Sequence, residues 1–298
     1  MNCELVVKNI RTALKEYVVK NNLNSLVVGV SGGIDSALVC ALSRPVCDEL
    51  GIKLIGRSLP IETNKQDEID RAIMVGESFC HDFLTDYSLE NVYDAFHVAL
   101  DAVVIQDSKS EKIRCGNIKA RLRMIYLYNL AYVNKGLVLS TDNLTEYYLS
   151  FWTQHGDVGD YAMLQHLWKT EVYEISRWIT DNELYCLKTK DQEKIIALEC
   201  CVICTPTDGL GITSSDLEQL GANTYDEVDI ILKTWLTKDQ DNFCWDTCFK
   251  YEGRTEDYNE FVKIRESYKD HAVVQRHINS QFKRDVPIIV SRSSLFQE

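Results

Sequence analysis

The chain has 298 residues, of which 45% are hydrophobic and 26% charged, and its formal net charge is -13. This length and composition are typical of a globular protein with a sizeable core. The excess negative charge opposes binding to nucleic acid, where neutralisation of phosphates supplies most of the affinity. We therefore expect no nucleic-acid partner, and we expect any anionic ligand to need local positive groups and a metal ion.

The sequence favours a cytoplasmic location without membrane association. No stretch approaches the roughly 20 apolar residues of a membrane span. The first residues carry charges throughout and lack the uninterrupted apolar stretch of a signal peptide. The eleven cysteines are scattered and odd in number, unlike the framework of a small secreted protein. Free thiols in a reducing compartment are the expected state.

Short apolar runs alternate with longer helical patterns along the chain. Strands are expected at 26–30, 53–58 and 137–140, and helices at 3–20, 36–50, 64–80, 89–105, 118–133, 169–181, 191–200, 225–236 and 256–270. This alternation predicts an α/β fold, with a doubly wound, mainly parallel sheet covered by helices on both faces and a helical C-terminal part. No Gly/Ser-rich linker interrupts the pattern, so we expect a single domain over residues 1–298.

The hexapeptide Ser-Gly-Gly-Ile-Asp-Ser, residues 31–36, connects the first expected strand to a helix. Glycines allow backbone N–H groups to converge on an anion, and the helix N-terminus adds its positive dipole end. The loop lacks both the Gly-Lys-Ser/Thr of nucleotide triphosphatases and the three spaced glycines of dinucleotide-binding folds. Asp35 would repel a phosphate unless a cation lay between them, which predicts Mg²⁺ bridging to a pyrophosphate. The alternative is an ordinary helix cap.

A second group of polar residues follows the expected strand at 137–140. Thr141 and Asp142 lie at its C-terminal end, where ligands bind in open α/β sheets. Glu146 shares a face with Asp142 if the segment is helical, which makes it a candidate second ligand to Mg²⁺. An exposed acidic pair is the alternative. Lys169 begins the next long helix and could reach a phosphate.

A cationic run, Gly-Asn-Ile-Lys-Ala-Arg-Leu-Arg-Met, occupies residues 116–124. Charged residues on a helix usually form a solvated face. The apolar residues around Lys119, Arg121 and Arg123 indicate that this helix is partly buried, so these charges are expected to have partners.

The hexapeptide closely resembles the SGGxDS loop of the ATP pyrophosphatase superfamily, whose members cleave ATP between the α- and β-phosphates and transfer AMP to an acceptor. The cationic run and the Thr-Asp-x-x-x-Glu segment that begins at Thr141 resemble motifs of ammonia-dependent NAD synthetases. Three further runs resemble that family in the same order, at residues 205–211, 216–232 and 282–287. The resemblance covers residues from about 25 to 290.

The resemblance implies an adenine nucleotide alpha hydrolase-like fold and a ligase. The implied reaction is the ATP-dependent amidation of deamido-NAD (nicotinic acid adenine dinucleotide) to NAD through an adenylated intermediate, with Mg²⁺ and release of AMP and pyrophosphate. No glutaminase domain is expected, so ammonia would be the nitrogen source. A homodimer is implied, and the helix at 118–133 is the candidate interface.

The resemblance also assigns roles to individual residues. It implies an ATP site at Gly29, Ser31, Gly32, Gly33, Asp35, Ser36, Thr141, Lys169 and Thr207, a metal site at Asp35 and Glu146, a deamido-NAD site at Arg121, Gln154, Asp160, Phe282 and Lys283, and catalytic roles for Asp35, Lys169 and Asp160. Gln154 stands where the family usually has lysine, and Phe282 stands where it usually has histidine.

Two other functions remain open from the sequence. Another ATP pyrophosphatase, such as a tRNA thiolase, would use a reactive cysteine pair, and Cys201 and Cys204 offer one. A nucleotide-binding sensor of similar fold would turn nothing over. Release of AMP and pyrophosphate from ATP separates an enzyme from such a sensor.

Overall fold

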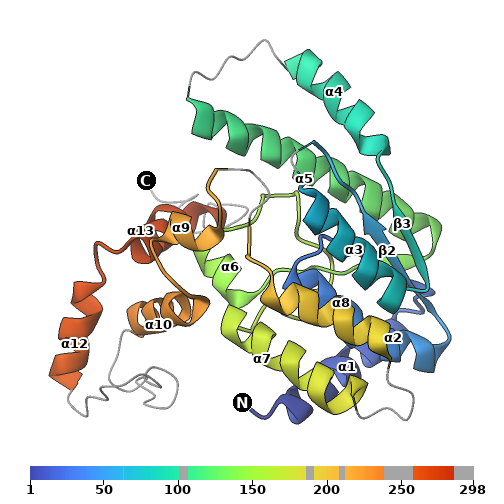
Figure 1. The fold of residues 1–298 in the computed structure, drawn as a ribbon, viewed down its shortest axis with the longest axis horizontal. Helices are drawn as coiled ribbons and strands as arrows, with labels where there is room; N and C mark the ends of the chain where they lie inside the picture. The colour runs from blue at the N-terminus through green and yellow to red at the C-terminus, as the bar shows by residue number, and fades with distance from the viewer. Residues whose placement is uncertain (63, 101–106, 186–190, 208–211, 238–257, 285–298) are drawn as a thin grey trace, which may run out of the picture.

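A computed structural model describes residues 1–62, 64–100, 107–185, 191–207, 212–237 and 258–284. Its centre is a parallel sheet, of which Figure 1 labels β2 and β3. The sheet has four strands in the order β3-β2-β1-β4. The strands are β1 (Ser25–Gly29), β2 (Lys53–Ser58), β3 (Asp82–Thr85) and β4 (Gly136–Val138). The predicted parallel sheet is therefore confirmed.

Helices surround this sheet. They are α1 (Cys3–Lys20), α2 (Ile34–Leu50), α3 (Gln66–Phe79), α4 (Ser88–Leu100), α5 (Ser108–Val133), α6 (Leu144–Leu149), α7 (Lys169–Ile179), α8 (Gln192–Ile203), α9 (Asp216–Leu220), α10 (Tyr225–Leu236), α12 (Tyr258–Ser267) and α13 (Ala272–Asn279), with a π-helix η1 (Thr180–Leu184) and a 3₁₀ turn η3 (Gln281–Lys283). Among the described residues, no helix combines the length and apolar character that crossing a membrane requires.

The two faces of the sheet bury different helices, because successive strand side chains point to opposite faces. Leu26 and Val28 of β1 pack into the larger core together with buried residues of α1, α2, α3, α7 and α8. Val27 and Ile55 face the other way and pack against α4 and α5. Figure 1 shows α4 and α5 on one side and α1, α2 and α8 on the other. The predicted double covering of the sheet is confirmed.

The C-terminal helices form a separate apolar cluster beside the sheet (Figure 1). Leu149 of α6, Leu220 of α9, Val228 of α10 and Val273 of α13 are fully buried against one another. This cluster confirms the expected helical C-terminal part, and it packs α6 against α10 and α13.

The structure adds elements that the periodicity did not reveal. β3 has only four residues and is partly exposed at the sheet edge, so its apolar pattern is weak. α9 and α13 span five and eight residues, too few for a clear helical period. Parts of the predicted segments at 89–105, 205–211, 256–270 and 282–287 lie outside the described residues.

Candidate active site

A cavity of about 700 Å³ opens at the C-terminal ends of the strands. Gly29 ends β1, Ser58 ends β2 and Val138 ends β4, and all three line it. This is the edge at which parallel α/β sheets bind ligands, because the loops that leave the strands and the N-termini of the following helices converge there.

The loop at residues 31–36 forms one wall of the cavity and places the start of α2 against it. The Ser31 backbone N–H donates to the Ser36 hydroxyl at 3.2 Å, and the Gly33 N–H donates to the Ser31 hydroxyl at 3.3 Å. The Ser36 hydroxyl in turn donates to the Gly33 carbonyl at 3.1 Å. These bonds close a compact turn whose backbone dipoles and helix terminus suit an anion.

Gly32 is required at its position in this loop. Its φ is +80°, in the left-handed region that favours glycine. A Cβ there would lie 2.2 Å from the backbone oxygen of Glu68 in α3. The Gly32 carbonyl accepts a hydrogen bond from the Arg71 Nε at 3.0 Å. The loop is therefore seated tightly on α3.

A buried charge cluster lies beside the loop. The Lys169 Nζ forms an ion pair with Asp35 and another, at 2.9 Å, with Glu146. The Lys169 side chain is 4% exposed, and the side chains of Asp35 and Glu146 are 14% and 19% exposed. Two carboxylates thus share one cation in a space with little solvent.

The charged groups of this cluster shift one another's pKa values. Burial opposes the charged form of Lys169, but Asp35 and Glu146 outweigh burial and raise the lysine pKa well above its usual range. Burial and the neighbouring Asp35 raise the pKa of Glu146. When both carboxylates are ionised the cluster has more negative than positive charge, and a further cation would stabilise the charged form of Glu146.

Asn143, which the sequence analysis did not single out, positions the carboxylates. Its side-chain Nδ2 donates to the Asp35 Oδ1 at 2.8 Å. Its Oδ1 accepts from the Glu146 N–H at 3.0 Å, as the N-cap of α6. One amide therefore aligns Asp35 with the helix that carries Glu146.

Asp229 of α10 anchors the start of α7, where Lys169 lies. Its carboxylate is 1% exposed and accepts hydrogen bonds from the Thr170 N–H and hydroxyl, at 2.9 and 2.7 Å, and from the Thr145 hydroxyl. The Thr145 hydroxyl oxygen accepts from the Lys169 N–H at 2.9 Å. The C-terminal helices thus position the central lysine.

Two further aspartates line the cavity with raised pKa values. Burial, followed by the nearby Asp157, raises the pKa of Asp142 to about 7. Burial raises the pKa of Asp157 to about 6, although the Thr153 N–H donates to its Oδ1 at 2.7 Å. Both groups can exchange a proton near neutral pH.

Two cations of α5, Lys119 and Arg123, also line the cavity. The Arg123 Nε donates to the Leu59 carbonyl at 2.8 Å, and burial lowers its pKa to about 10. Lys119 is buried and pairs with Glu62 at 2.9 Å. The expectation that Lys119, Arg121 and Arg123 have partners is confirmed, but Arg121 is exposed.

All of the residues predicted to bind ATP or metal line this cavity. The residues of the prediction that line the cavity are Gly29, Ser31, Gly32, Gly33, Asp35, Ser36, Thr141, Glu146, Lys169, Thr207, Phe282 and Lys283. The Thr207 hydroxyl donates to the Glu68 Oε1 at 2.8 Å. The Lys283 Nζ donates to the Ser150 carbonyl at 2.9 Å and also to the Trp152 carbonyl.

Three predicted deamido-NAD residues are not among the described residues that line the cavity: Arg121, Gln154 and Asp160. The Arg121 Nε donates to the Gln154 carbonyl at 3.2 Å. Asp160 accepts from the Tyr128 hydroxyl at 2.8 Å. The aspartate of this segment that reaches the cavity is Asp157.

The cysteine pair at the end of α8 is close to the loop but poorly suited to nucleophilic chemistry. The Cys201 thiol donates to the Gly32 carbonyl at 3.5 Å, and burial raises its pKa to about 12. Burial also raises the pKa of Cys204, which lines the cavity. Reactive cysteines need a lowered pKa, so these environments disfavour a thiolase.

Comparison with known proteins gives consistent matches. A family model described as NAD synthase matches residues 6–287. An NH(3)-dependent NAD(+) synthetase from Mesoplasma florum is 33% identical over 223 residues, which cover 74% of this chain and 80% of that protein.

Two solved structures share the fold. The NMN synthetase from Francisella tularensis has a TM-score of 0.71 at 21% identity and covers 98% of this chain and 99% of its own. The NH3-dependent NAD synthetase from Campylobacter jejuni has a TM-score of 0.64 at 19% identity and covers 98% and 100%. These identities establish the fold alone. The sequence match, in contrast, includes the loop, Lys169 and both carboxylates, and it places the chain in the NAD synthase family.

Proposed function

We propose that this protein is an ammonia-dependent NAD synthetase that converts deamido-NAD to NAD. The observation that carries the proposal is the buried Lys169–Asp35–Glu146 cluster beside a glycine loop at a helix N-terminus. The family match and the Mesoplasma relative support this activity. The free state of the eight described cysteines supports a cytoplasmic setting.

In the first step, an oxygen of the nicotinate carboxylate attacks the α-phosphorus of ATP, and the bond from that phosphorus to the bridging oxygen breaks. Pyrophosphate leaves with the electron pair. The loop at residues 31–36 and the N-terminus of α2 would stabilise the charge on this leaving group. Lys169, whose raised pKa keeps it protonated, would neutralise developing charge beside the loop.

The carboxylates of Asp35 and Glu146 suit Mg²⁺. They are hard oxygen donors, and when both are ionised they carry more negative charge than Lys169 offsets. Bound there, Mg²⁺ would supply charge neutralisation to the phosphates of ATP. Asn143 would keep Asp35 aligned for that role through its bond to the Oδ1.

In the second step, the nitrogen of ammonia attacks the adenylated carboxyl carbon, and the bond from that carbon to the AMP oxygen breaks. AMP leaves with the electron pair, and the new amide nitrogen releases one proton to solvent. Ammonium must lose a proton before it can attack. Asp157 is the candidate to accept that proton, because it lines the cavity and its pKa is about 6. Asp160, whose carboxylate accepts a hydrogen bond from the Tyr128 hydroxyl, would position its loop against α5.

A homodimer formed through α5 would explain why Arg121, a predicted deamido-NAD residue, is not among the described residues that line the cavity. Ile125 and Tyr132 on α5 are 66% and 87% exposed, and Arg121 lies on the same face at helical spacing. A second copy packed on this face would cover Arg121 and complete the dinucleotide site. Sedimentation velocity at micromolar concentration is expected to give a dimer, and the Ile125→Arg variant a monomer. A monomeric wild-type protein would contradict this arrangement.

The function is tested by incubating the protein with ATP, Mg²⁺, ammonium and deamido-NAD, with NAD detected through a coupled dehydrogenase. We expect NAD, AMP and pyrophosphate in equal amounts, and little NAD when glutamine replaces ammonium. A parallel reaction contains nicotinate mononucleotide, because the Francisella neighbour is an NMN synthetase. Faster amidation of the mononucleotide would overturn the proposed substrate.

The matched variant for this test is Asp35→Asn, which retains the side-chain volume. We expect AMP formation to fall by at least about 10²-fold, the usual effect of losing one electrostatic contact in the transition state. The fold should persist, because Lys169 retains Glu146 as its partner. The helix-cap explanation of Asp35 is already excluded, because Gly33 is the N-cap of α2 and no side chain caps it. A variant that unfolds would therefore show that Asp35 is needed for folding, and it would contradict a purely catalytic role.

A further inference from the structure

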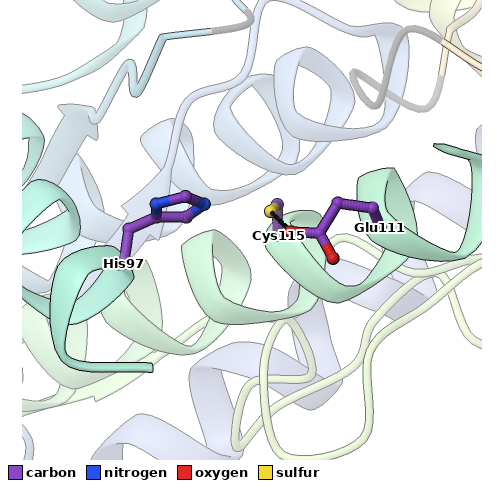
Figure 2. A group of neighbouring side chains, drawn as sticks. All are labelled: His97, Glu111 and Cys115. Atoms are coloured by element: carbon purple, nitrogen blue, oxygen red, sulfur yellow. Dashed lines mark hydrogen bonds between the residues drawn. The ribbon is translucent and has the colours of Figure 1, made fainter. Parts of the chain in front are cut away.

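Helices α4 and α5 bring three metal-binding side chain types together on the sheet face opposite α2. His97 comes from α4, and Glu111 and Cys115 come from one face of α5, four residues apart. One ligand atom from each lies within 4.8 Å of the others. In Figure 2 the imidazole ring of His97 is turned toward the Cys115 sulfur, and a dashed line joins Cys115 to Glu111.

We propose that His97, Glu111 and Cys115 bind a divalent cation of the zinc type, at a site separate from the active site. A nitrogen, an oxygen and a sulfur ligand together match the borderline-soft preference of Zn²⁺ and are a poor match for Mg²⁺, which takes oxygen ligands. None of the three is among the described residues that line the large cavity. The cation would therefore join two helices and take no part in the ligase reaction.

The geometry requires only a small adjustment. Tetrahedral zinc with bonds of about 2.0–2.3 Å separates neighbouring ligand atoms by roughly 3.5 Å. The three atoms are at most 4.8 Å apart, and all three residues are half-buried, so rotation of the side chains can close the set. Solvent can supply the fourth ligand.

Glu111 is held in place by Arg114. Arg114 donates from its Nε to the Glu111 Oε2 at 2.9 Å and also pairs with the Oε1. Arg114 can keep its bond to the Oε2 while the Oε1 turns to the cation, as an outer partner that orients a metal ligand.

Cys115 now uses its thiol proton in a hydrogen bond to the Glu111 Oε1 at 3.4 Å. On metal binding the sulfur ligates as thiolate, the S–H bond breaks, and its proton passes to solvent. The bond between Cys115 and Glu111 is replaced by two bonds to the same ion. The sequence offered no sign of this site, because His97 and Cys115 lie in different helices.

The test uses Co²⁺ as an optical probe on full-length protein freed of metal with a chelator. A thiolate–cobalt charge-transfer band in the near ultraviolet reports sulfur coordination, which the carboxylates of the active site cannot produce. We expect this band to saturate at one Co²⁺ per chain and Zn²⁺ to displace it.

Three variants distinguish this site from others. Cys115→Ser should abolish the band, and His97→Ala should weaken cobalt affinity by at least about 100-fold. Cys204→Ser, which changes a half-buried cysteine in another part of the chain, should retain the band. Circular dichroism of each metal-free variant checks the fold. Absence of the band in folded wild-type protein, its survival in Cys115→Ser or its loss in Cys204→Ser would overturn the proposal.

Discussion

Replacing Lys169 with methionine is expected to lower the rate of AMP formation by about 10²–10³-fold. The same variant should lose about 3–5 kcal/mol of free energy of unfolding, the usual cost of removing one partner of a buried ion pair. Methionine matches the length of the aliphatic part of lysine, so little packing is lost. The losses in rate and in stability would therefore come from the missing charge.

The physical reason is the pair of carboxylates that Lys169 separates. Without the ammonium, Asp35 and Glu146 face one another in a space from which solvent is largely excluded. One of them must take up a proton or the pair must move apart, and either response disrupts the phosphate side of the cavity. The bond from the Lys169 backbone N–H to Thr145 survives, so α7 should still begin at the same residue.

Urea unfolding in the presence of a chelator measures the stability change, and pyrophosphate release from ATP and deamido-NAD measures the rate. The matched control is Lys194→Met, which removes a partly exposed ion pair with Asp191. We expect this control to change stability by less than about 1 kcal/mol. A Lys169→Met protein with wild-type rate and stability would contradict the role assigned to the cluster.

The second large effect is expected for Gly32→Ala. The positive φ of Gly32 and the close Glu68 oxygen both oppose a side chain, so the loop must move away from α3. We expect a loss of about 2–4 kcal/mol in the free energy of unfolding, as for other substitutions at a strained or overpacked position. ATP binding should weaken by at least about 10-fold, because the turn that presents the backbone to the phosphates is displaced.

Two other glycines serve as controls that separate the cost of the backbone conformation from the cost of the contact with α3. Gly33 has no positive φ, and a Cβ there would meet only the Ser31 hydroxyl at 3.4 Å, so Gly33→Ala should change stability by less than about 1 kcal/mol. Gly51 has a φ of +65° in open space, so Gly51→Ala isolates the cost of the backbone conformation, about 1 kcal/mol. Thermal unfolding and ATP titration compare the three. Equal effects at Gly32 and Gly51 would show that contact with α3 is unimportant.

The sequence by itself determined the order of the main elements and the phosphate-binding loop. Both are local properties: a strand or helix of sufficient length repeats its apolar residues at a fixed period, and Ser31 to Ser36 are consecutive. The match of motifs along the chain also determined the family. Short elements such as β3 and α9 were missed because a few residues cannot establish a period.

Only the tertiary structure decided which charged groups meet. Lys169 and Asp35 are 134 residues apart, and no spacing rule connects them. The resemblance assigned the catalytic role to Asp160, but Asp160 accepts a hydrogen bond from the Tyr128 hydroxyl, whereas Asp157 lines the cavity. The bridge between Leu139 and Tyr161 fixes the backbone beside Asp160. Side-chain direction in a loop depends on what the backbone packs against, and that information is distributed over the whole chain.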